Sequence, residues 1–239
     1  ASIKDKENKD VITVDNPTVP VTISKPNDIF ASAIEKTYDG TGFDILNKVA
    51  EKANSLANGT NNKFVDIEVK VKVDNTDYIY TILAGQTAGT WNQAGTPKTS
   101  PNVKATTLGT AENYEYPVTI TFKDAAEGST ASNSTNTNAK FKINYAEVTV
   151  RANDKSKKTT EPDPTTFDAT VSGMVNGENA SEKLTYEITR ADPTNNSAGS
   201  YTITPAGDKY QNNYEVTYET GTLTITKGDP TATEFSLTG

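Results

Sequence analysis

Carboxylates are the most abundant side chains in this sequence that could do chemistry. The 239 residues include 31 Asp and Glu, and two carboxylates held close together are what glycoside hydrolysis needs. With so many acidic residues some pairs must lie close together by chance, and no motif singles out one pair. The sequence therefore indicates no catalytic residue, and we expect that the chain is not an enzyme.

Histidine and cysteine are both absent. Without histidine the chain lacks the usual general base and the commonest ligand of transition metals. Without cysteine it can form no disulfide, thiolate nucleophile or Cys-ligated zinc site. We therefore expect no catalytic, cofactor-binding or metal-binding residues, and no cofactor.

Two further kinds of site would use oxygen and nitrogen side chains. The run Asp74-Asn75-Thr76-Asp77 has oxygen ligands at alternating positions, as calcium loops do. It lacks the glycine and the distal glutamate of an EF-hand, so we interpret it as a β-turn between two strands. Lys–Asn isopeptide bonds, which occur in some bacterial surface domains, need a buried lysine, an asparagine and a carboxylate. No spacing selects such a trio here, and lysine is seldom buried.

The charge balance and hydropathy limit the partners. The net charge of −8 repels phosphate backbones, and no Lys/Arg cluster is interleaved with aromatic residues, so we expect no nucleic-acid partner. No stretch reaches the roughly eighteen apolar residues that span a bilayer, so we expect no membrane span in this segment.

The chain divides into two β-rich modules. Residues 1–18 are predicted to be a charged lead-in and entry segment, of which the first ten or so residues are solvated. The first module is predicted over 19–146 and the second over 147–227, which leaves 228–239 as a linker or the start of a further module. In the second module strands are expected at 148–151, 167–172, 184–189, 200–204, 214–218 and 222–226, with a possible helical turn in 174–182.

An amphipathic helix and a half-buried strand are the clearest elements of the first module. Apolar residues at spacings of three and four predict the helix over 44–58, namely Leu46, Val49, Ala53 and Leu56. Four β-branched residues that alternate with charged ones predict a strand with one wet face, namely Ile67, Val69, Val71 and Val73. Further strands are expected at 78–83, 116–122 and 140–145. The Ser/Thr/Asn-rich stretch 124–138 is predicted to be a mobile hairpin loop.

Short anchors recur in the same order in both halves, which indicates an internal repeat. The paired stretches are Lys36-Thr37-Tyr38-Asp39-Gly40 with Lys158-Thr159-Thr160-Glu161-Pro162, Ala88-Gly89-Thr90-Trp91 with Ala198-Gly199-Ser200-Tyr201, Asn113-Tyr114-Glu115 with Asn213-Tyr214-Glu215, and Lys140-Phe141-Lys142-Ile143-Asn144 with Thr222-Leu223-Thr224-Ile225-Thr226. We therefore expect a mostly β fold of two tandem small antiparallel β-sheet modules. A β-grasp-like sheet and an Ig-like sandwich both fit, and the helix favours the former for the first module.

Several stretches of the second half carry a family resemblance. They are Val148-Thr149-Val150, Asp154-Lys155-Ser156-Lys157, Asp163-Pro164, Ser172-Gly173-Met174-Val175-Asn176-Gly177-Glu178, Ala198-Gly199-Ser200-Tyr201 and Gly221-Thr222-Leu223-Thr224-Ile225. Over residues 147–227 the chain resembles the MBG repeat domain of bacterial cell-surface and adhesin-like proteins. The first half is similar to the related Tyr-Asp-Gly type through Lys36-Thr37-Tyr38-Asp39-Gly40-Thr41. The resemblance implies extracellular display in arrays and supplies no catalytic residues.

Together these features predict a non-catalytic structural or adhesion module of a bacterial surface protein, a spacer or weak binding domain in a tandem array. Its partners would be host or cell-wall glycans or proteins and the neighbouring modules of the same chain. The alternative is a carbohydrate-binding module attached to a secreted glycan-active enzyme. Trp91, the single Trp, would then stack on sugar. In the alignment of the two halves Trp91 corresponds to Tyr201, which indicates a packing role instead.

Overall fold

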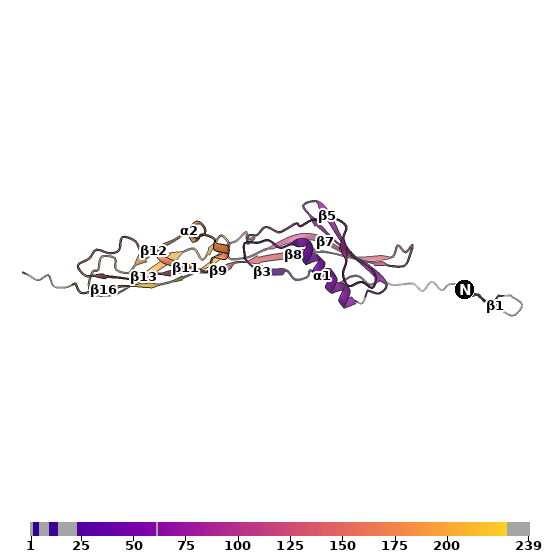
Figure 1. Cartoon of the computed structure of the whole chain (residues 1–239), viewed down its shortest axis with the longest axis horizontal. Helices are drawn as coiled ribbons and strands as arrows, with labels where there is room; N and C mark the ends of the chain where they lie inside the picture. Colours follow the sequence, from indigo (N-terminus) through magenta and orange to yellow (C-terminus); the bar gives the residue numbers. More distant parts are fainter. Residues whose placement is uncertain (1, 5–9, 14–22, 61, 229–239) are drawn as a thin grey trace, which may run out of the picture. The chain divides into compact units, whose positions relative to one another are not determined.

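The computed structural model describes residues 2–4, 10–13, 23–60 and 62–228, and strands dominate it, as the sequence predicts (Figure 1). The chain forms two compact units. Unit 1 comprises Ala1–Ala31, Leu46–Thr96 and Tyr116–Ala139, and unit 2 comprises Ser32–Ile45, Pro97–Glu115 and Lys140–Gly239. Unit 2 thus contains segments from the first half of the sequence. The predicted module boundary at 146–147 stays a prediction.

Unit 1 combines a sheet with the predicted helix. The helix is α1 (Ile45–Thr60), and the buried side chains on it include Val49, Ala53 and Leu56. The sheet has the order β3-β8-β7-β4-β5-β6. The strand bounds are β3 (Ile34–Thr37), β4 (Val65–Val73), β5 (Thr76–Ile82), β6 (Thr90–Trp91), β7 (Asn113–Asp124) and β8 (Ser132–Asn144). Tyr80 Oη on β5 donates a hydrogen bond to Asn54 Oδ1 on α1 at 3.0 Å. This bond fixes the helix against the sheet.

Strand β4 confirms the predicted alternation. Its residues Ile67, Val69, Val71 and Val73 are all buried. It pairs antiparallel with β5 through a two-residue turn at Asp74 and Asn75, whose φ angles are 45° and 65°. Positive φ at both turn residues is the geometry that tight β-hairpins require, so the predicted turn is present.

The prediction of a mobile loop over 124–138 is wrong. Strands β7 and β8 occupy most of this stretch and leave only 125–131 between them. Thr135 is buried, and its Oγ1 donates to the carbonyl oxygen of Pro26 at 2.6 Å. Polar composition did not prevent a strand here, because a neighbouring segment of the same chain accepts hydrogen bonds from the polar side chains that the strand buries.

Parts of the two chain ends lie outside the described residues. Within the predicted lead-in 1–18, the described residues form β1 (Ser2–Lys4) and β2 (Asp10–Thr13), which pair antiparallel. Of the predicted segment 228–239, only Gly228 is described.

Unit 2 contains two four-stranded sheets, with the orders β10-β16-β13-β12 and β11-β9-β15-β14. Their bounds are β9 (Ala146–Ala152), β10 (Lys155–Lys158), β11 (Ala169–Ser172), β12 (Tyr186–Arg190), β13 (Gly199–Gly207), β14 (Tyr210–Gln211), β15 (Tyr214–Glu219) and β16 (Gly221–Thr226). Ala152 from one sheet packs with Ile203, Leu223 and Ile225 from the other. The two sheets therefore face each other across one apolar core. The predicted helical turn is present as η1 (Val175–Gly177) and α2 (Ala180–Lys183).

Both halves of the sequence contain a parallel strand pair. In the first, β3 (Ile34–Thr37) pairs with the end of β8 and sets Lys36 opposite Ile143. In the second, β10 pairs with β16 and sets Lys157 opposite Ile225. With the closing strands aligned as predicted, Lys36 is therefore equivalent to Lys157. The anchor that matched Lys36 with Lys158 is wrong by one residue.

Candidate functional site

The sequence predicts no site residues, so the candidate sites are side chains that the structure brings together. Among residues 23–60 and 62–228, no three acidic side chains gather closely enough to hold a metal ion. No helix in the described ranges is long and apolar enough to cross a membrane. Unit 2 instead holds a partly buried carboxylate and two buried tyrosines.

Glu178 accepts hydrogen bonds from two tyrosines that are far apart in the sequence. Tyr38 Oη donates to Glu178 Oε1 at 2.9 Å, and Tyr214 Oη donates to Oε2. The two rings meet edge to face with their centroids 5.6 Å apart. Tyr38 is 5% exposed and Tyr214 is fully buried. We call these three residues the tyrosine–glutamate cluster.

Local backbone geometry places each member of the cluster. Tyr38 directly follows β3, and its N–H donates to the carbonyl of Asn144 at 2.8 Å, which continues the parallel pairing. Glu178 follows the turn η1, whose last residue, Gly177, has a φ of 72°. The N–H of Val175 in that turn donates to Tyr214 Oη at 3.1 Å. The phenol of Tyr214 therefore holds both the turn and the carboxylate.

The residues after Tyr38 attach to the same turn. Asn176 Nδ2 donates to the carbonyl oxygen of Asp39 at 2.6 Å. Gly40 has a φ of 76°, and a Cβ there would lie 2.6 Å from Asn176 Nδ2. Only glycine suits this close approach. The Asp39 carboxylate accepts from Lys36 Nζ at 2.9 Å. The Tyr-Asp-Gly motif thus has a physical reason at each position.

The electrostatics of the cluster favour stable hydrogen bonds over proton transfer. The hydrogen bond from Tyr214 lowers the pKa of Glu178, and Lys183 Nζ at 3.5 Å from Oε1 acts in the same direction. Burial, together with the nearby carboxylate, raises the pKa of Tyr214 to about 12. Burial also raises the pKa of Tyr38. At neutral pH the carboxylate is therefore charged and both phenols keep their protons.

Asn213, next to Tyr214, binds a second segment of the first half. Its Oδ1 accepts from the N–H of Val103 at 2.9 Å, and its Nδ2 donates to Asn102 Oδ1 at 2.9 Å. Its carbonyl oxygen accepts from the N–H of Ala146 at 3.0 Å. The side chain and backbone of one buried asparagine therefore join segment 97–115 to the start of β9.

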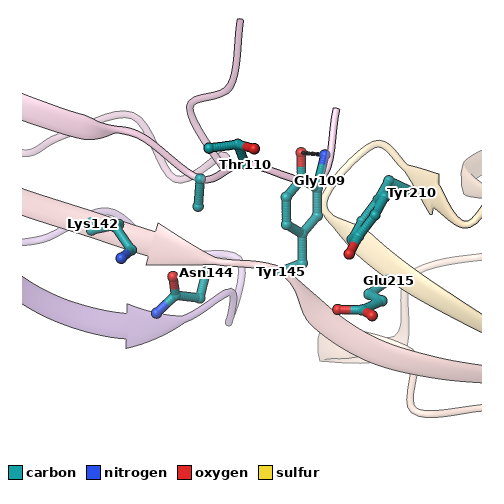
Figure 2. A pocket seen from close by; sticks show the side chains of 8 residues that line it. Gly109, Thr110, Lys142, Asn144, Tyr145, Tyr210 and Glu215 are labelled. Atoms are coloured by element: carbon teal, nitrogen blue, oxygen red, sulfur yellow. Dashed lines mark hydrogen bonds between the residues drawn. The ribbon is translucent and has the colours of Figure 1, made fainter. Parts of the chain in front are cut away.

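A pocket of about 370 Å³ lies beside this attachment (Figure 2). It is lined by Gly109, Thr110, Ala111, Lys142, Asn144, Tyr145, Tyr210 and Glu215. The rings of Tyr145 and Tyr210 are tilted by 51° with centroids 5.0 Å apart, and the N–H of Gly109 donates to Tyr145 Oη at 3.3 Å. We call it the tyrosine pocket. Aromatic faces with charged neighbours are suited to polar ligands that have an apolar face, such as sugars.

Trp91, the candidate stacking residue, is partly buried in β6. Its ring centroid lies 5.0 Å from that of Tyr80 and 6.5 Å from that of Tyr78. These contacts give the indole a packing role in the sheet.

The comparisons with known proteins concern the second half. Residues 148–224 match the model of the MBG domain (YGX type). No match was found among curated proteins or among solved structures. Glu178 and Tyr214 lie inside the matched range, whereas Tyr38 lies outside it. Residues 148–224 therefore form an MBG-type repeat domain, the family that their sequence motifs indicate.

Proposed function

We propose that the chain is a non-catalytic structural module of an extracellular bacterial surface protein and that it acts as a spacer in a tandem array. The MBG domain supports the assignment to a surface protein. The tyrosine–glutamate cluster carries the spacer role. It ties Tyr38 to Glu178, 140 residues later in the chain, through a charge-assisted hydrogen bond.

A spacer works when the chain that precedes a domain is fixed to that domain. Three kinds of contact support such fixation in unit 2. Tyr38 binds the Glu178 carboxylate, Asn176 binds the backbone of Asp39, and Asn213 binds segment 97–115. All three join the MBG domain to segments of the first half. None of them has the form of a catalytic centre.

Two equivalent parallel strand pairs, β3–β8 and β10–β16, support the tandem arrangement. The N–H of Tyr38 donates to the carbonyl of Asn144 just beyond the β3–β8 pair, and the N–H of Thr159 donates to Thr226 just beyond the β10–β16 pair, both at 2.8 Å. The MBG domain therefore ends on the same backbone arrangement that precedes it. A further module can follow Thr226 in the way that β9 follows β8.

A display experiment tests the spacer role. The chain would be placed between a cell-wall anchor and a small antigen-binding domain on the bacterial surface. Cells with the chain should capture antigen-coated beads through a thick surface glycan layer, and cells with a direct fusion should not. Equal capture by both would contradict a spacer role. A flexible Gly/Ser linker of equal residue number serves as the control for length alone.

The tyrosine pocket favours carbohydrate binding as a second candidate function. Lys142 and Glu215 offer a donor and an acceptor in the lining of the pocket. Glu215 lies beside the two rings, and Lys142 lies beyond Asn144 (Figure 2). One face of Tyr210 already lies near Lys209, whose Nζ is 5.2 Å from the ring centroid. A glycan array with the purified chain tests this candidate. A micromolar hit that Tyr210→Ala abolishes and Tyr186→Ala preserves would support it over the spacer role.

A further inference from the structure

Lys157 is the buried lysine that the sequence could not single out. Its side chain on β10 is 3% exposed, and its Nζ lies 2.6 Å from Asp163 Oδ1. The same Nζ donates to Asn196 Oδ1 at 2.6 Å and to the carbonyl of Glu161 at 3.0 Å. A buried amine, a carboxamide and a carboxylate thus meet at one nitrogen atom. We propose that Lys157 and Asn196 form an intramolecular isopeptide bond and that Asp163 transfers the proton.

Arg190 holds the other reactants in place. Its side chain is 2% exposed, and Nε lies 3.0 Å from Asp163 Oδ2. Nη2 donates to the carbonyls of Asp192 and Asn195 at 2.9 and 2.6 Å. These bonds fix the loop that carries Asn196. Because Arg190 is itself not the nucleophile, we regard it as a positioning residue.

The charges of the cluster favour the amide product. Among these side chains, two buried cations, Lys157 and Arg190, face the single carboxylate of Asp163. Burying an excess charge is costly. An amide at Lys157 removes one positive charge and leaves Arg190 and Asp163 as a matched pair.

The reaction needs no oxidant or other reactant. Asp163 accepts a proton from the Lys157 ammonium, and the neutral Nζ attacks Cγ of Asn196, whose carbonyl oxygen it already contacts. The new Nζ–Cγ bond forms and the Cγ–Nδ2 bond breaks. Asp163 returns the proton to the departing nitrogen, which leaves as ammonia, and that ammonia takes up the second Nζ proton to become ammonium. A lysine ammonium and a carboxamide become a secondary amide and a free ammonium ion, and Asp163 is unchanged.

The bond would join strand β10, which pairs with the last described strand β16, to the loop between β12 and β13. The two residues are 39 positions apart. When the chain is pulled from its ends, the segment between them could not extend. This inference concerns the MBG domain alone, and it holds whether or not the chain is a spacer.

Mass spectrometry of the full chain tests the proposal. The intact mass should be lower than that of the sequence by one ammonia. Asn58-Gly59 and Asn176-Gly177 could also lose ammonia by ring closure, so the decisive product is a branched tryptic peptide that contains both Lys157 and Asn196. Trypsin cleaves after a free lysine, so linear peptides that end at Lys157 and a full intact mass would overturn the proposal.

Variants separate the bond from general folding effects. Asn196→Ala changes a side chain in an exposed loop, so it should fold and yield linear peptides only. Lys157→Met should do the same, and Asp163→Ala should slow or abolish bond formation. Lys158→Met, which changes the neighbouring lysine, should keep the branched peptide. Trypsin should cleave normally after Lys36, the equivalent residue in β3, because no bond is expected there. A branched peptide that persists in Asn196→Ala would overturn the assignment of Asn196.

Discussion

Replacing Tyr214 with phenylalanine would remove one oxygen atom and keep a fully buried ring. That oxygen donates to the Glu178 carboxylate and accepts from the N–H of Val175. A hydrogen bond to a charged group contributes about 1.5–3 kcal/mol, and a donor that loses its partner adds to this cost. The edge-to-face contact with Tyr38 would remain. We therefore expect Tyr214→Phe to lower the free energy of unfolding of unit 2 by about 2–4 kcal/mol.

Two further variants give this value a scale. Tyr38→Phe loses a bond to Glu178 but leaves Tyr214 in place, so it should cost less, about 1.5 kcal/mol. Tyr186→Phe, on the edge strand β12, should change stability by under about 0.5 kcal/mol. Because both tyrosines bind one carboxylate, their effects should not be additive: the stability cost of the double variant of Tyr38 and Tyr214 should differ from the sum of the two single costs.

Urea unfolding followed by circular dichroism measures these differences, with hydrogen exchange to identify the transition that belongs to unit 2. The chain has two compact units, so a single two-state fit is inappropriate. Surface substitutions change the free energy of unfolding by up to about 0.5 kcal/mol. If Tyr214→Phe changes the stability of unit 2 by no more than this, the view that the phenol holds the carboxylate and the turn is refuted.

Other substitutions and conditions test the remaining steps. The lowered pKa of Glu178 means that its contribution to stability is present above the ordinary value of 4.5 and is lost as the pH falls below it, so acid unfolding should be less steep in Glu178→Gln. The pKa of Tyr214, raised from 10.0 to about 12, means that its contribution is lost as the pH rises through that range; a tyrosinate absorbance titration should lose its latest component in Tyr214→Phe. Gly40→Ala should cost about 1–3 kcal/mol, because strained φ and the approach of Asn176 act together. Gly128→Ala, with a φ of 77° and open space around it, should cost less and is the control in the same urea assay. Trp91→Ala should cost about 2–4 kcal/mol without changing any glycan binding, because its ring packs on Tyr78 and Tyr80; an unchanged melting transition would contradict this.

The sequence predicts those elements whose stability comes from their own pattern. Strand β4 alternates apolar and charged residues, and helix α1 repeats apolar residues at three and four, so both could be identified locally. The first part of β8 could not, because its side chains are stabilised by a distant segment. Thr135, for example, bonds to Pro26, 109 residues earlier. Without that partner the same residues have the composition of a loop.

The candidate site escaped prediction for a similar reason. Tyr38, Glu178 and Tyr214 all lie in stretches that the sequence comparison of the two halves or the family resemblance had marked. Their meeting depends on contacts across 140 residues, which no local period reveals. A possible signal was the type of residue at these places, since a tyrosine beside a strand end and a glutamate after a Gly turn are not needed for an apolar core.

The equivalent lysines Lys36 and Lys157 show how the same strand position can have two outcomes. Each lies on the edge strand of a parallel pair, opposite an isoleucine. The Nζ of Lys36 donates to Asp39 and Thr41 in the loop that directly follows its own strand, and its side chain stays 22% exposed. The Nζ of Lys157 instead contacts Asn196 from another loop. The parallel strand pair places the lysine, and the loop that covers it determines whether the amine meets a carboxamide as well as a carboxylate. Covalent closure is thus expected in the MBG domain and not at β3.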